Sequence, residues 1–169
     1  MLKEMIGFGR SKARAQALNT ALVQRARAPV FFRDLGVADT VDGRFDMVVA
    51  HAWLVLTWLN DLGQRELAQT LVDTIFTGFD EGVRELGVGD MGAGHRVKKI
   101  ADAFYGRLNA YSSGNLAEAV LRNVYRGDLM RNSDAAVIAN YLSGARKFLS
   151  QQNLSTEIDF GPLPNTHAP

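Results

Sequence analysis

Apolar positions recur along this chain at steps of three and four residues almost everywhere. That spacing places them on one face of an α-helix. Glycines, prolines and short polar clusters separate these stretches, and such residues end helices or form turns. No alternating run is long enough to predict a β-sheet. We therefore expect an all-α fold, a single compact domain of six or seven helices. The predicted helices span residues 12–27, 29–35, 44–61, 64–86, 95–111, 116–125 and 134–151.

Residues that favour helix starts, turns and chain ends set the boundaries of this organisation. The expected N-caps are Ser11, Asn115 and either Ser133 or Asn132, since their side chains accept hydrogen bonds from a first helical turn. Residues 39–43 are expected to form a turn. We expect three parts: a basic N-terminal segment and helix at 1–28, a helical domain at 29–152, and a mobile tail at 153–169.

Composition excludes several classes of protein. The chain has 169 residues, of which 47% are hydrophobic and 22% charged, a mix typical of a soluble globular domain and not of a disordered chain. Cysteine is absent, which removes disulfide scaffolds, thiol catalysis and thiolate metal sites. Only three histidines are present, His51, His95 and His167, too few for a histidine-rich metal site.

The longest apolar run covers residues 47–59 and is interrupted only by His51 and Thr57. A helix of that length covers about 20 Å, whereas crossing a bilayer takes about 20 apolar residues. We therefore expect a buried helix in a cytoplasmic protein, with peripheral contact to the inner membrane as an open alternative. His51 is expected to be a hydrogen-bonded core residue rather than a ligand.

Charge is unevenly distributed although the net charge is only +1. Residues 1–33 carry seven cations and one anion, whereas residues 34–90 carry three cations and eleven anions. Such blocks produce a field that can steer charged partners, or they simply form solvated faces. The basic residues Arg10, Lys12, Arg14, Arg25 and Arg27 keep a salt-sensitive contact with RNA open as one alternative.

Residues 87–92 match the spacing G-x-G-x-x-G, which binds dinucleotides when a strand precedes it and a helix follows. A predicted helix precedes it here, so we interpret the segment as a loop between two packed helices. No Ser-His-Asp arrangement is persuasive either, and we expect neither an enzyme nor a bound cofactor.

The helix predicted at 95–111 carries a row of cations, Arg96, Lys99 and Arg107, with Lys98 and Tyr105 beside it. One interpretation is a solvated helix face. The other is a basic ridge that docks an acidic or phosphate-bearing partner, with Tyr105 as an amphipathic anchor.

Two blocks of sequence resemble the ubiquinol–cytochrome c chaperone family, the assembly factors of the cytochrome bc respiratory complex. The first block reads DTVDGRFD at 39–46 and HAWL at 51–54. The second reads LGVGDM at 86–91, RVKK at 96–99 and AFYGR at 103–107. The similarity spans roughly residues 29–149.

The resemblance implies a non-enzymatic chaperone that holds newly made cytochrome b before complex assembly. It also implies cytochrome b or another bc complex subunit as client, with contact to the ribosome and to a small partner protein in mitochondrial members. A holder of apolar client segments needs an exposed apolar groove with a polar rim. We expect Arg96, Lys98, Lys99, Tyr105 and Arg107 to form part of that rim. Phe31 and Phe32 are expected to add apolar contact if their segment lies outside the core.

Two other functions remain open from the residues alone. A helical module that binds haem or a lipid would have an enclosed apolar pocket near His51 or Met91. A ribosome- or RNA-associated protein would work through the cations that precede residue 33.

Overall fold

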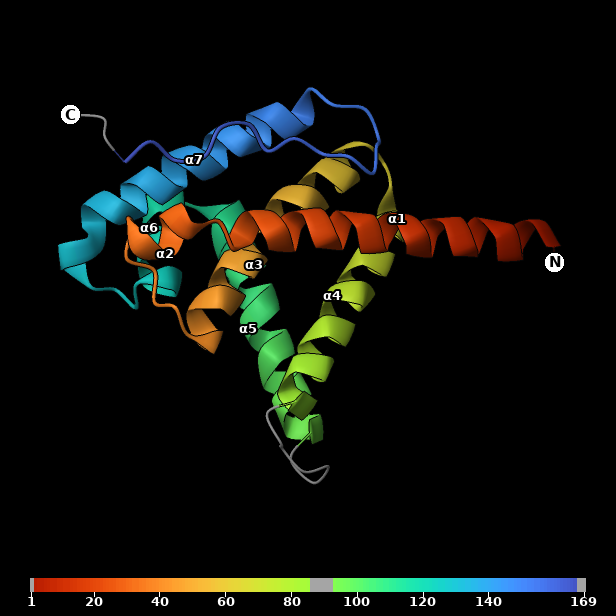
Figure 1. The fold of residues 1–169 in the computed structure, drawn as a ribbon, viewed down its shortest axis with the longest axis horizontal. Coiled ribbons are helices and arrows are strands. Elements are labelled where there is room, and N and C mark those ends of the chain that lie inside the picture. The colour runs from red at the N-terminus through yellow and green to blue at the C-terminus, as the bar shows by residue number, and fades with distance from the viewer. Residues whose placement is uncertain (1, 86–92, 167–169) are drawn as a thin grey trace.

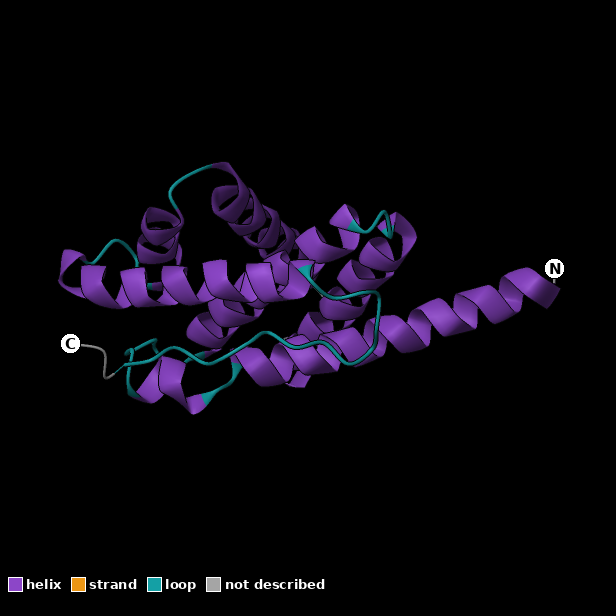
Figure 2. Cartoon of the chain, turned by 90° about the horizontal axis from the view of Figure 1, so that it is seen from above, coloured by secondary structure: helices purple, strands orange, loops and turns teal. Residues whose placement is uncertain are grey.

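The structure, a computed structural model, describes residues 2–85 and 93–166 and confirms the predicted all-α fold, with no strand in those ranges (Figures 1 and 2). The helices, in chain order, are α1 (Leu2–Ala26), α2 (Pro29–Arg33), α3 (Val41–Asp61), α4 (Arg65–Glu85), α5 (Ala93–Ser113), α6 (Leu116–Val124), the 3₁₀-helix η2 (Leu129–Arg131) and α7 (Asn132–Ser150).

Helix α3 forms the centre of the core, and α1, α4, α5, α6 and α7 all pack against it. Its residues from Met47 to Leu56 are buried without exception, which accounts for the long apolar run. Because a helix buried on nearly all sides needs neighbours all around it, this run determines the arrangement of the other helices. Helices α4 and α5 converge toward the end where the undescribed residues 86–92 connect them (Figure 1).

The predicted starts of α1 and α3 are wrong, because both helices begin earlier in the chain. Helix α1 already runs from Leu2, and its first turns project beyond the body (Figures 1 and 2). Ser11 therefore lies inside it, with its hydroxyl 3.4 Å from that of Thr70 on α4. Helix α3 begins at Val41 within the predicted turn, since the Thr40 side chain accepts a hydrogen bond from Gly43 N and caps it.

Of the remaining predicted N-caps, Asn115 is confirmed, whereas neither Asn132 nor Ser133 caps α7. The Asn115 side chain accepts from the backbone N–H groups of Ala117 and Glu118, so it caps α6 as expected. Helix α7 has no side-chain cap at its start, because η2 leads directly into it. Asp128 caps η2 instead by accepting from Met130 N.

The segment that follows α7 packs back onto the domain in the described range up to residue 166, rather than extending from it as a tail (Figure 2). Phe160 is buried, and the Arg25 guanidinium on α1 donates to the carbonyl of Gly161. Gln152 and Asp159 exchange two hydrogen bonds across the return of the chain. The C-terminal segment therefore contributes to the core between α1 and α7.

Gly43 gives the first test of this packing. A Cβ atom at this position would lie 1.9 Å from the carbonyl oxygen of Ala38, and a backbone atom cannot rotate away. Gly43→Ala is expected to lower the free energy of unfolding by about 1–3 kcal/mol, as measured by urea unfolding.

Gly106→Ala on α5 is the matched control, because a Cβ there meets no atom within 4 Å. Alanine favours a helix over glycine by up to about 1 kcal/mol, so this variant is expected to be more stable than the wild type. Equal behaviour of the two variants would contradict the close contact at Gly43.

Candidate protein-binding surface

Three cations of the predicted ridge lie free on the first turns of α5. Arg96, Lys98 and Lys99 are exposed, and none has an ion-pair partner within the described ranges. Unpaired cations at one end of a helix attract anionic groups, and salt screens that attraction. These three positions are thus available to a partner.

Arg107 does not belong to this exposed row. Its Nε donates to Asp46 Oδ1 at 2.8 Å, and its Nη1 donates to the Ala103 carbonyl. Its guanidinium also stacks over the ring of Phe45, 5.2 Å from the centroid. With only 18% of its side chain exposed, Arg107 connects α5 to α3 and is no part of an accessible rim.

Asp46 is fully buried and lies between two guanidinium groups. Arg107 contacts one carboxylate oxygen, and Arg126, which follows α6, lies 2.8 Å from the other. Burial raises the pKa of Asp46, and the two arginines oppose that rise. Arg126 itself has a φ of 56°, a conformation that is costly for a residue with a side chain. The triad of Asp46, Arg107 and Arg126 fixes α5 and the end of α6 against α3.

A continuous cluster of aromatic rings joins α3, α4 and α5. Phe76 on α4 lies 5.2 Å from Phe104 and 6.3 Å from Tyr105 on α5, and the rings of Phe76 and Tyr105 stack at 23°. Phe45 on α3 lies 5.1 Å from Phe79. Phe104 is fully buried, whereas Tyr105 is 52% exposed. The cluster therefore runs from the core to the surface.

We call the exposed end of this cluster and its neighbours the aromatic–basic face. Val97, about two turns nearer the start of α5, is a further apolar side chain at the surface, 42% exposed. An apolar surface bordered by cations can bind an apolar segment whose flanks carry negative charge. Under this name we group the stacked rings of Phe76 and Tyr105 with the exposed side chains on the first turns of α5, Arg96, Val97, Lys98 and Lys99.

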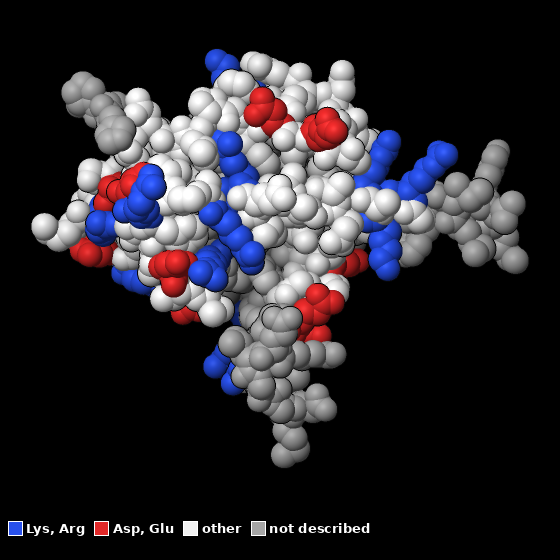
Figure 3. All heavy atoms as spheres, in the orientation of Figure 1, with Lys and Arg blue, Asp and Glu red and all other residues white. Residues whose placement is uncertain are grey.

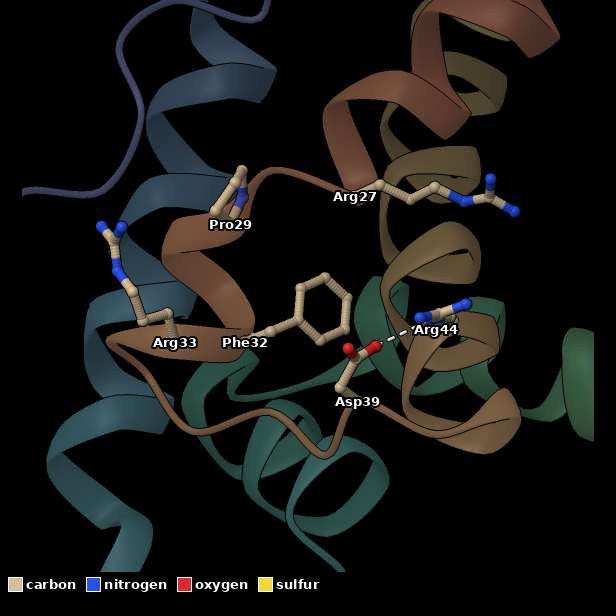
Figure 4. Close-up of a pocket in the computed structure, with 6 residues that line it drawn as sticks. All are labelled: Arg27, Pro29, Phe32, Arg33, Asp39 and Arg44. Carbon is tan, nitrogen blue, oxygen red and sulfur yellow. Dashed lines mark hydrogen bonds and ion pairs between the residues drawn. The ribbon is translucent and has the colours of Figure 1, made fainter.

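The two neighbouring phenylalanines of α2 have different environments. Phe31 is fully buried against the rings of His51 and Tyr141, so it lies in the core and is not accessible for partner contact. Phe32 is half-buried and lines a pocket of about 600 Å³ at the surface, shown in Figure 4. Its other lining residues are Arg27, Pro29, Arg33, Asp39 and Arg44.

His51 is a hydrogen-bonded core residue, as predicted. Its Nδ1 lies 2.7 Å from the Met47 carbonyl, and its Nε2 lies 2.8 Å from the Tyr141 hydroxyl. Since both ring nitrogens are engaged and the side chain is fully buried, His51 does not ligate haem or a metal in this structure. Met91 and the glycine motif at 87–92 lie outside the described residues.

The basic N-terminal residues divide into two groups. Arg25 turns inward, where its Nε donates to the Tyr141 hydroxyl at 2.9 Å. Arg10, Lys12 and Arg14 are exposed, and Figure 3 shows cationic atoms gathered over the projecting part of α1 at the right, with acidic atoms below them over α4.

Within the described residues, no three His, Asp or Glu side chains could hold a metal ion, and no helix is long and apolar enough to span a bilayer.

Sequence reasoning missed the aromatic cluster and most of the pocket. Phe104 was recognisable as part of an apolar helical stripe, but the stripe does not show that it meets Phe76 from another helix. The pocket combines Arg27, Phe32 and the pair Asp39 and Arg44 from three separate segments. The sequence carried one signal for it, the Asp39–Arg44 spacing in a turn-like stretch.

Two comparisons place the chain among known proteins, and a third found nothing. The family described as Ubiquinol-cytochrome C chaperone matches residues 33–158. A solved structure, the crystal structure of the Cbp3 homolog from Brucella abortus, superposes with a TM-score of 0.76 at 30% sequence identity, covering 90% of each chain. No curated protein matches. The chain therefore belongs to the ubiquinol–cytochrome c chaperone family, the assembly factors of the cytochrome bc complex.

Proposed function

We propose that this chain holds newly made cytochrome b before assembly of the bc complex, and that the aromatic–basic face on α4 and α5 is its contact surface. Family membership supports the role of an assembly chaperone and suggests that the role is not enzymatic. The observation that supports the surface is the stack of half-exposed Tyr105 on Phe76, with exposed Lys98 two turns earlier on the same side of α5.

The physical requirements of a holder agree with this surface. A membrane-protein client exposes apolar helices and charged loops before it is assembled, and a holder must cover the former without reacting with them. Aromatic side chains give a large contact area at a low cost in conformational entropy. The cations at 96, 98 and 99 add attraction for acidic loop residues and raise the rate of encounter.

The contact is tested by placing a photo-crosslinking amino acid at position 105 in cells that assemble the bc complex. Cytochrome b is expected in the crosslinked product from position 105. The same probe at Leu163, an exposed apolar position in the C-terminal segment, is expected to give no such product. Equal yields at the two positions, or no cytochrome b at 105, would refute the proposed surface.

Charge reversal gives a second measurement of the same surface. The double variant Lys98→Glu and Lys99→Glu is expected to recover about tenfold less cytochrome b in a pull-down, because two attractive contacts become repulsive. Arg107 is left intact, since it anchors α5 to Asp46. The matched control reverses two other exposed cations, Arg122 and Lys147. Circular dichroism confirms folding, and equal recovery from both double variants would rule out a role for the cations.

A further inference from the structure

We propose that the pocket beside α2 binds an acidic peptide segment of a partner protein, with peptide carboxylates on Arg27 and Arg44 and a neighbouring apolar side chain on Phe32. We call this site the α2 pocket. It uses other residues than the aromatic–basic face, so the proposal does not depend on cytochrome b being held there.

The α2 pocket is built by three segments that meet at the surface. Arg27 follows the end of α1, Pro29 and Phe32 belong to α2, and Asp39 and Arg44 flank the start of α3. The pocket is open to solvent, and its volume of about 600 Å³ gives room for peptide side chains. Figure 4 shows the Phe32 ring between Pro29 on one side and Asp39 with Arg44 on the other.

The cations of the α2 pocket differ in how far they are neutralised. Arg33 is bound to Asp34 through two hydrogen bonds of 2.7 and 2.9 Å, and it extends to the opposite side of α2 from the Phe32 ring (Figure 4). The Arg27 guanidinium has no hydrogen-bond or ion-pair partner in the described part of the chain. Arg27 is thus a charged donor group without an anion.

Arg44 is held in place but keeps donors free. Its Nε donates to Asp39 Oδ1 at 2.7 Å, and within the described residues its two terminal amino groups have no partner. A carboxylate that fixes one edge of a guanidinium orients the other edge for a second anion. Arg27 and Arg44 extend on the same side of the Phe32 ring (Figure 4), so both face the space beside that ring.

The apolar wall makes a peptide a better occupant than a free anion. Phe32 packs against the core from its half-buried position, and its neighbour Phe31 is fixed between His51 and Tyr141. The wall is therefore held before any ligand binds, which lowers the entropy cost of binding. A free phosphate ion would contact only the guanidinium groups, whereas an acidic segment with an aliphatic or aromatic neighbour would use the cations and the wall together.

The test measures fluorescence anisotropy of a labelled ten-residue peptide that alternates glutamate with leucine and phenylalanine, added to the full chain. The wild type is expected to bind it, with affinity that falls as salt rises. Arg27→Gln and Phe32→Ala are each expected to weaken binding by about tenfold. Lys147→Gln, which removes an exposed cation on α7, is the matched control and is expected to bind like the wild type.

Two further probes identify the chemistry. The same peptide with glutamine in place of glutamate is expected to bind at least about tenfold more weakly. Inorganic phosphate is expected not to displace the glutamate peptide at equal concentration. No binding of the glutamate peptide, equal binding of both peptides, or displacement by phosphate alone would overturn the proposal. None of these results bears on the crosslink at position 105, so the two proposals fail separately.

Discussion

Asp46→Ala is expected to lower the free energy of unfolding by about 3–5 kcal/mol, the cost of breaking a buried ion pair by removing one partner. The loss is large because Arg107 stays largely buried after its carboxylate is gone. Arg126 would also lose its ion-pair partner while it keeps its left-handed backbone conformation. Urea unfolding followed by circular dichroism measures the change.

Asp39→Ala is the matched control, since it removes an aspartate from an ion pair with arginine at the same 2.7–2.8 Å spacing but at the surface. Exposed pairs contribute about 1 kcal/mol or less, so this variant is expected to unfold close to the wild type. If Asp46→Ala also unfolds within about 1 kcal/mol of the wild type, then the triad does not hold α5 on α3.

The interiors of the helices followed from the sequence, because burial of one face imposes a period that the apolar residues record. Their ends followed less well, since a helix end depends on which of several competent side chains reaches the first turn. Thr40 and Ser11 have similar chemistry, but Thr40 caps α3 while Ser11 lies within α1 facing Thr70. Only the position of α4 decides the role of Ser11.

For the candidate surface, the helical period predicted which side chains are exposed but not which residues pair between helices. Arg96, Lys98 and Lys99 are exposed as their helical positions suggested. Arg107 shares their charge and the helical row of Arg96 and Lys99, but its partner Asp46 lies 61 residues earlier. Periodicity within one helix contains no information about that pairing. Phe31 and Phe32 differ in burial, but α2 has only five residues, too few for a hydrophobic period that would show which of the two faces the core.

The stability of the chain is expected to fall by about 3 kcal/mol between pH 7 and pH 4 through His51 alone. Burial lowers the pKa of His51 from 6.5 to about 4, with a smaller contribution from the nearby charge of Arg25 and an opposing one from the Met47 carbonyl. Between these two values the unfolded chain binds a proton that the folded chain does not. Acidification therefore favours unfolding through this window, and the stability from neutral His51 is complete above pH 6.5.

The variant His51→Gln isolates this contribution, because it keeps a polar side chain near Tyr141 but cannot titrate. Its difference in unfolding free energy from the wild type is expected to shrink by about 3 kcal/mol from pH 7 to pH 4, while other groups cancel in the comparison. If the unfolding free energies of the two proteins run parallel with pH, then His51 binds its proton equally in the folded and unfolded states. The hydrogen bonds from Arg25 through Tyr141 to His51 would then not depend on a neutral imidazole ring.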